Sequence, residues 1–401
     1  MDQALLPAIG PRPWPVPALP PGAEPTFAGL CAAVFGSLPR SDQRRRAEQY
    51  VSGLMSLAGR KSMRRIASLS GEGADEQSLQ HFISKSTWDW VPVRRAVARH
   101  LARERPAEAW VVAPLSIPKA GSHTVGVDRR FVSELGRTAN VQQAYGLWFT
   151  TGGGGVPANW RLVLPEAWID DPGRRLRGDI PASAAAEPPV LAAASVAAEV
   201  LGWSMERRPV VADARMLGFR RLADALADAD LPVLARISEN SQLTVTSRTL
   251  PGYGHGPLTA RQILEAARGT CRPVEWTDPD TGTARASLAV TVAVSQCRAA
   301  DGPRTAKHAA PGGAHDVLTL LGEWRHPDGA LAEAWLTNLG PSGPGRLLRT
   351  AKLLGVVTRD LTSAGDRMGL RDFTGRTYQG WHRHMTLASV ALTASRLDGL
   401  G

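Results

Sequence analysis

The chain has 401 residues, of which 43% are hydrophobic and 21% charged, a composition that excludes a disordered or fibrous protein and allows two or three globular domains. Its net charge of +10 and its pI of about 10.2 favour a polyanionic partner, with nucleic acid as the first candidate. Free use of arginine by a high-GC genome is the alternative origin of this charge.

The cysteines and the hydropathy pattern bear on where the protein works. Cys31, Cys271 and Cys297 form no CxxC pair, so we expect no zinc site, and a cytoplasmic, nucleoid-associated location fits better than secretion. No run of about 18 apolar residues lacks a charge or a breaker, which predicts no membrane span. Prolines interrupt residues 1–26, and this segment is typical of a disordered tail rather than of a signal peptide.

Residues 27–105 predict a helical domain that binds DNA. Apolar residues between Ala47 and Ala58 recur at helical spacing, and Ser70 to Gly73 separates two short periodic segments, as in a helix–turn–helix. Residues 40–105 hold 14 Lys and Arg against seven Asp and Glu. This concentration favours contacts with phosphates, and a solvated helix face is the alternative. The densest clusters contain Arg44, Arg45, Arg46, Arg60, Lys61, Arg64 and Arg65.

The rest of the chain predicts an α/β protein. From residue 106 to about 244, strands are expected at 109–113, 124–127, 144–149, 160–164 and 209–213, with a hairpin turn at the glycines 152–155. Between 245 and 315 helical periodicity is mostly lost and short strands predominate, followed by a linker at 301–314. Residues 316–401 then return to strands at 318–324 and 334–338 and to helices at 344–362 and about 380–397.

Short motifs follow one another along the whole chain. They are Asp42-Gln43-Arg44-Arg45, Arg60-Lys61-Ser62, Trp88-Asp89, Pro118-Lys119-x-Gly121, Gly126-Val127-x-Arg129-Arg130, Leu164-Pro165-Glu166-Ala167-Trp168, Val211-Ala212-Asp213-Ala214, Trp335-Leu336-Thr337-Asn338-Leu339, Ala351-Lys352-Leu353 and Gly380-Trp381-His382-Arg383-His384. In these motifs and their order, the chain resembles DDE-type transposases of the insertion sequence 701 family from about Phe27 to Leu397.

The resemblance implies an RNase-H-like mixed sheet with a β-rich insertion, preceded by an all-helical domain. The helical domain would be 27–105, the core 106–244 and 316–401, and the insertion and linker 245–315. Such enzymes hold two Mg²⁺ ions about 3.5–4 Å apart with three carboxylates and attack a DNA phosphodiester in line. The resemblance further implies double-stranded DNA and self-association as partners, and it requires the ends of the strands at 109–113 and 209–213 to be neighbours.

The chain departs from the family at two of the three acids. Where the family has an Asp pair after the first strand, this chain has Ala113-Pro114, and the family's Glu on a C-terminal helix aligns with Thr358. The second acid aligns with Asp213, which is present. Asp360 lies two positions after Thr358, about 200° away around a helix, so it does not substitute for the Glu. We therefore expect no metal cofactor and no strand transfer.

Three functions remain open at this stage. The first is a transposase-derived DNA-binding protein that regulates or inhibits transposition, with Lys119, Arg129 and Arg130 as further DNA contacts. The second is a metal-independent enzyme that handles a small molecule in a closed, apolar pocket. That pocket would be built from Ala113, Pro114, Ser116, His123, Asp213 and Thr358. The third is an active transposase whose third acid lies elsewhere. The alternative to all three is a decaying gene without function. Asp213 by itself is equally compatible with a residue that caps a loop at a strand end.

Overall fold

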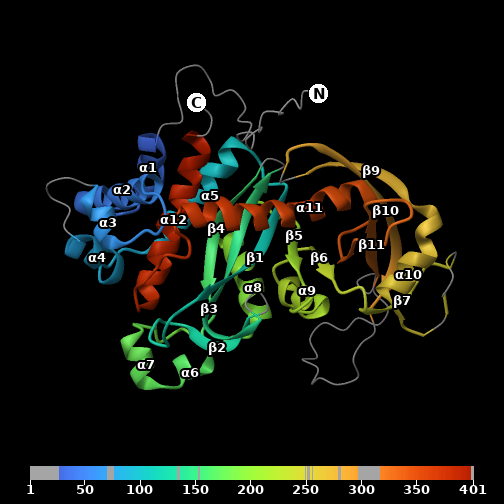
Figure 1. Ribbon diagram of the computed structural model, residues 1–401, viewed down its shortest axis with the longest axis horizontal. Coiled ribbons are helices and arrows are strands. Elements are labelled where there is room, and N and C mark those ends of the chain that lie inside the picture. The colour runs from blue at the N-terminus through green and yellow to red at the C-terminus, as the bar shows by residue number, and fades with distance from the viewer. Residues whose placement is uncertain are drawn as a thin grey trace, which may run out of the picture.

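One mixed β-sheet runs through the computed structural model of the protein (Figure 1), which describes residues 27–69, 76–132, 136–151, 154–248, 250, 253–254, 256–278, 281–296 and 317–398. The tail expected at 1–26, the turn expected at 70–73 and the linker expected at 301–314 lie outside these residues. No helix among the described residues is long and apolar enough to cross a membrane.

The sheet has twelve strands in the described part of the chain. They are β1 (Ala109–Pro118), β2 (Val127–Val132), β3 (Arg137–Thr151), β4 (Gly154–Leu162), β5 (Val210–Asp213), β6 (Val233–Ile237), β7 (Gln242–Val245), β8 (Leu258–Thr259), β9 (Arg272–Thr277), β10 (Ala284–Ser295), β11 (Leu318–Trp324) and β12 (Glu333–Thr337). Their order is β2-β3-β1-β5-β6-β12-β11-β10-β7-β8, with β4 also paired to β3 and β9 to β10. β5 is parallel to both β1 and β6, and the other pairs are antiparallel, which confirms the predicted mixed sheet.

Twelve α-helices lie among the described residues, and several of them, such as α8, α9, α11 and α12, cover the two faces of the sheet. They are α1 (Phe27–Phe35), α2 (Ser41–Ser56), α3 (Met63–Ser68), α4 (Glu76–Ser84), α5 (Trp90–Glu104), α6 (Glu166–Ile169), α7 (Pro172–Arg177), α8 (Pro189–Ala198), α9 (Phe219–Ala227), α10 (Ala260–Ala267), α11 (Pro344–Asp360) and α12 (Tyr378–Asp398). Side chains alternate along β1, so that Val111 and Ala113 join the core beneath α11 and α12, whereas Trp110 and Val112 join the core beneath α8 and α9. Strands buried on both faces explain why their sequences read as nearly continuous apolar runs.

The N-terminal helices pack against α12 rather than forming a separate body (Figure 1). Arg94 of α5 is buried and donates hydrogen bonds to Thr386 at 2.8 Å and to Nδ1 of His382 at 3.0 Å, both on α12. His384 lies between the hydroxyl of Tyr50 and the carbonyl of Gly369, each at 2.9 Å. Both histidines are buried, so they have packing roles. The predicted α/β fold with a preceding helical region is confirmed.

Acid should destabilise this helical interface. Burial lowers the pKa of His384 from 6.5 to about 4, so between these pH values the unfolded chain binds a proton that the folded chain does not. Stability is therefore present above pH 6.5 and is lost as pH falls toward 4, by about 1.4 kcal/mol per pH unit for one histidine. We expect His384→Gln to reduce the slope of unfolding free energy against pH by that amount, as measured by denaturant titration. An unchanged slope would contradict this assignment.

Several predicted boundaries are wrong for local physical reasons. The strand expected at 124–127 begins only at Val127, because Gly126 takes a φ of +74° that ends the extended conformation. The strand expected at 160–164 ends at Leu162. β3 and β4 pair antiparallel, as expected of a hairpin; Gly154 and Gly155 belong to β4, and 152–153 lie outside the described residues. The β-rich segment also contains α10, whose start is fixed by a capping box between Thr259 and Gln262.

Candidate functional site

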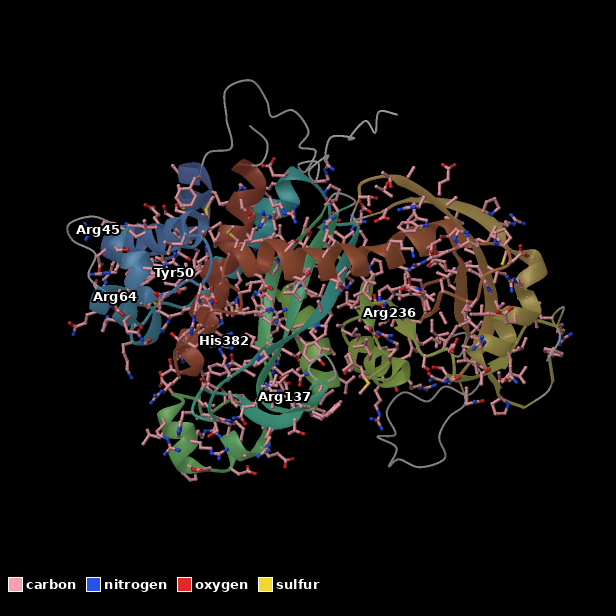
Figure 2. All side chains as sticks on the ribbon, in the orientation of Figure 1. Arg45, Tyr50, Arg64, Arg137, Arg236 and His382 are labelled. Carbon is pink, nitrogen blue, oxygen red and sulfur yellow. The ribbon has the colours of Figure 1, made fainter. Side chains whose placement is uncertain are left out.

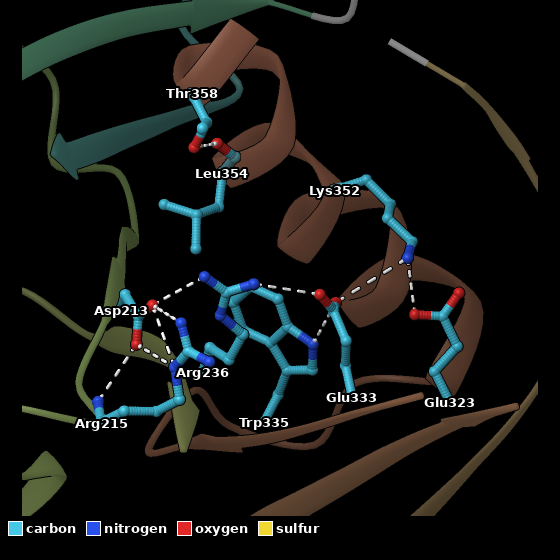
Figure 3. A network of polar contacts seen from close by, with 9 residues as sticks. All are labelled: Asp213, Arg215, Arg236, Glu323, Glu333, Trp335, Lys352, Leu354 and Thr358. Atoms are coloured by element: carbon cyan, nitrogen blue, oxygen red, sulfur yellow. Dashed lines mark hydrogen bonds and ion pairs between the residues drawn. The ribbon is translucent and has the colours of Figure 1, made fainter. Parts of the chain in front are cut away.

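Asp213 ends β5 and is held by two arginines. Its side chain is 21% exposed and accepts from Arg215 at 2.7 Å and from Arg236 at 2.6 Å (Figure 3). Arg236 reaches it because β5 and β6 are parallel neighbours in which these two residues pair. Burial alone would raise the pKa of the Asp213 carboxyl, but the hydrogen bonds from the two guanidinium groups outweigh burial and hold the pKa below its ordinary value. The carboxylate is therefore ionised, and both of its oxygens are engaged.

A chain of alternating charges continues from Arg236 to α11 (Figure 3). Arg236 donates to Glu333 on β12 at 3.1 Å, and Glu333 lies opposite Glu323 on β11. Two carboxylates in this position repel each other, and Lys352 of α11 offsets the repulsion, with Nζ 2.5 Å from Glu323 and 3.9 Å from Glu333. Glu323 is fully buried and also accepts from the Ser287 hydroxyl at 2.7 Å. The paired cations make burial of these carboxylates tolerable.

The resemblance aligns Ala113, Asp213 and Thr358 with the three acids of the family. These positions face the same region, but only Asp213 carries a carboxylate. Val112 pairs with Ala212, so Ala113 and Asp213 follow on adjacent parallel strands, about 4.8 Å apart. The two positions are neighbours as predicted, but the strand end expected at residue 113 is wrong, because β1 stays paired with β3 as far as Pro118. Thr358 lies on α11, which contacts both strands. Its hydroxyl donates to the carbonyl of Leu354 at 2.8 Å, which satisfies the hydroxyl within the helix.

Asp360 has a structural role on the other side of α11. Its side chain is buried and accepts from the backbone N–H of Gly155 at 2.7 Å. It also forms ion pairs with Arg359 and with Arg396 of α12, each at 2.8 Å. The expectation that this acid does not take the place of a Glu at position 358 agrees with these contacts.

The residues at this site do not fit a pair of Mg²⁺ ions. Mg²⁺ requires several oxygen ligands in nearly octahedral geometry, whereas the Ala113 side chain has none to offer and both Asp213 oxygens are bound by guanidinium groups. Arg236 lies between Asp213 and Glu333 and binds both, so a cation there would have to displace it. Within the described ranges, no group of three or more His, Cys, Asp and Glu side chains could hold a metal ion.

A cavity of about 840 Å³ opens beside this charge chain, between α11, β6, β9, β10 and the β11–β12 connection. Its lining includes Arg236, Glu333, Lys352 and Thr358. The cavity differs from the closed, apolar pocket expected from the sequence, because seven charged side chains are among the residues that line it. Of the six residues predicted for that pocket, Thr358 lines this cavity; Pro114 and His123 are exposed elsewhere.

Four of the seven basic residues predicted to contact DNA in the N-terminal segment are exposed, namely Arg45, Arg60, Arg64 and Arg65. Arg45 on α2 and Arg64 on α3 lie on two helices that pack together, far from Arg236 in the view of Figure 2. Arg45, Arg60 and Arg64 are exposed, and no hydrogen bond or ion pair engages their side chains within the described residues. Arg44 and Arg65 donate to backbone carbonyls, and Arg46 binds Asp42 and Ser78. The charge cluster therefore forms an accessible surface with some members fixed in place.

Lys61 is an exception among the predicted DNA contacts. It is 5% exposed and its ammonium group donates to the carbonyl of Leu57, so we withdraw it from the set of phosphate contacts. Burial also lowers the pKa of Lys119 to about 8, and its Nζ donates to the carbonyl of Phe373 at 2.7 Å. Arg129 on β2 is exposed. Arg130 is bound to Asp128 at 3.2 Å.

Sequence reasoning missed Arg215, Arg236, Glu323, Glu333 and Lys352. A signal was present, because Arg236 and Glu323 are charged residues inside apolar strands, where a charge requires a partner. Lys352 was noted only as a member of the motif Ala351-Lys352-Leu353, with no partner assigned to it. Arg236 lies 23 residues from Asp213 and 97 from Glu333, and Lys352 lies 29 residues from Glu323, too far for local periodicity to connect them.

Two comparisons with known proteins bear on the identity of the chain. No curated protein matches it significantly. A family model described as DDE superfamily endonuclease matches residues 33–301, which covers the N-terminal helices, the parallel strands with Asp213 and the strands up to β10. The protein is therefore a member of the DDE superfamily endonuclease family.

Proposed function

We propose that this protein is a transposase-like DNA-binding protein, close to the insertion sequence 701 group, that does not perform metal-dependent strand transfer and acts as a regulator or inhibitor of transposition. The observation that carries the proposal is the state of Asp213, whose oxygens are bound by Arg215 and Arg236 while Ala113 and Thr358 stand at the other two aligned positions. A carboxylate saturated by cations inside a retained DDE fold favours binding over cleavage.

Residues 27–105 are the proposed DNA-binding unit. Support comes from the exposure of Arg45 on α2, Arg64 on α3 and Arg60 in the loop between these helices, and from the excess of basic residues in this segment. Duplex DNA attracts such a surface through its phosphates and releases counterions on binding, so the affinity depends steeply on salt. Contacts to phosphates alone give binding that does not depend on DNA sequence. Contacts to bases would come from the exposed Gln77, Gln80 and His81 of α4.

DNA binding measured against salt tests this proposal. The logarithm of the affinity for a duplex should fall linearly with the logarithm of salt concentration, and Arg45→Ala and Arg64→Ala should each flatten the slope by about one unit. Fluorescence anisotropy with a labelled duplex gives both quantities. Arg349→Ala, an exposed arginine on α11, is the matched control and should leave the slope unchanged. Absence of binding at low salt would overturn the proposal.

A further inference from the structure

The cavity beside α11 is lined by five basic side chains and by two carboxylates, Asp278 and Glu333. Three further carboxylates, Asp213, Glu323 and Asp360, pair with Arg236, Lys352 and Arg359, so the charge of these three is already neutralised. The basic residues are Arg236, Arg285, Arg325, Lys352 and Arg359. We propose that this cavity binds the phosphate groups of a nucleotide, either a free nucleoside polyphosphate or the phosphorylated end of a DNA strand.

The charges divide into a fixed floor and an accessible rim. Arg236 and Lys352 are engaged with Glu333 and Glu323, so they form a rigid, nearly neutral floor (Figure 3). Arg285 and Arg325 lie on the rim. The Arg285 side chain is 55% exposed and pairs with Asp278 at 3.2 Å. Arg325 and His326 are exposed in the connection between β11 and β12. The phosphate groups of a ligand would therefore bind to the basic side chains of the rim.

The arrangement suits phosphate better than a single carboxylate. The rim groups come from β10 and from the β11–β12 connection, with Arg359 of α11 across the cavity, so one ligand would meet cations from several directions. Guanidinium groups bind phosphate oxygens in a bidentate manner. Within the described residues Arg325 has no ion-pair partner, so a phosphate group of a nucleotide or of a DNA end would bind it and compete with Asp278 for Arg285.

The size and the remaining lining suit the nucleoside part. A volume of about 840 Å³ lies within the usual range of roughly 300–1,000 Å³ for small-molecule sites. Trp276, Ala286, Leu354 and Gly355 add apolar surface to the wall. Trp276 is held in place, because its indole N–H donates to Ser287 at 2.9 Å and Nζ of Lys352 lies 4.4 Å from its ring. This surface can accept the sugar and base of a nucleotide while the rim binds the phosphates.

Two titrations separate the sources of the phosphate. In the first, ADP and inorganic pyrophosphate are titrated into the full-length protein by calorimetry. In the second, one single-stranded oligonucleotide is titrated with and without terminal phosphates, so that any contribution of the N-terminal helices cancels in the comparison. The DNA arm rests on the proposed function, whereas the ADP arm does not. Variants Arg325→Ala and Arg285→Ala test the rim, and Arg349→Ala on α11 is the control.

Each outcome decides the matter. Binding of ADP that weakens about tenfold or more in Arg325→Ala and in Arg285→Ala, and is unchanged in Arg349→Ala, supports a free nucleotide. A gain in affinity from terminal phosphates that disappears in the same two variants supports a DNA end. Failure of both arms overturns the inference, as does binding that persists in the Arg285→Ala/Arg325→Ala double variant. Failure of the oligonucleotides to bind at all, with ADP still bound, would count against the proposed function alone.

Discussion

Supercoiled DNA is expected to remain intact when the purified protein is incubated with Mg²⁺ or Mn²⁺. Two-metal cleavage needs carboxylates that hold both ions. Here Asp213 is bound by Arg215 and Arg236, and Ala113 and Thr358 carry no charge. Loss of a single stabilising group in an active site commonly costs about 10²–10³ in rate, and loss of the ligand set should cost more. A gel assay of nicking measures this directly. Metal-dependent nicking that Asp213→Ala abolishes would show that a working site survives.

Restoring cleavage should require several changes made together. Ala113→Asp and Thr358→Glu supply the missing carboxylates, and Pro114 must also change, because proline fixes φ near −65° and removes a backbone donor. The structure adds a further requirement. Arg236 binds Asp213 at 2.6 Å and would compete with any metal ion, so Arg236→Gln belongs in the same multiple variant. Single changes should give no activity, since ligands of one site act as a unit and their effects do not add. Activity from one single reversion would contradict this scheme.

Removal of the Lys352 ammonium group should cost about 3–5 kcal/mol of unfolding free energy, because it leaves the charge of Glu323 buried without its partner. Glu323 is fully buried and its carboxylate lies 2.5 Å from Nζ of Lys352. We expect Lys352→Met to show this loss in denaturant unfolding. The double variant Lys352→Met/Glu323→Gln should recover most of the stability, because the uncompensated charge is gone.

The controls for this prediction separate charge from packing. Arg349→Met changes an exposed residue of the same helix and should be nearly neutral. Glu323→Gln alone leaves a neutral side chain that still accepts from Ser287, and it should cost less than Lys352→Met. A Lys352→Met variant as stable as the unmodified protein would show that the ion pair does not hold α11 against β11 and β12.

Local sequence pattern was sufficient for much of the fold. The apolar runs at β1, β5 and β6 and the periodicity of α2 and α11 follow from side-chain spacing, which is a property of neighbouring residues. The concentration of basic residues at 40–105 is likewise a property of composition. The resemblance located Asp213 and placed it beside Ala113, and the pairing of Val112 with Ala212 agrees with that placement.

Only the tertiary structure decided what surrounds Asp213. Arg236 meets it because β6 lies next to β5 in parallel register, and Glu333 meets Arg236 because β12, nearly a hundred residues later, inserts on the far side of β6. Lys352 completes the chain from a helix that crosses the sheet. Strand order and register depend on long-range pairing, which no local periodicity encodes. The resemblance read from the sequence therefore predicted that two acids are missing from this site, whereas the sheet topology determined that arginine and lysine neutralise the acids that are present.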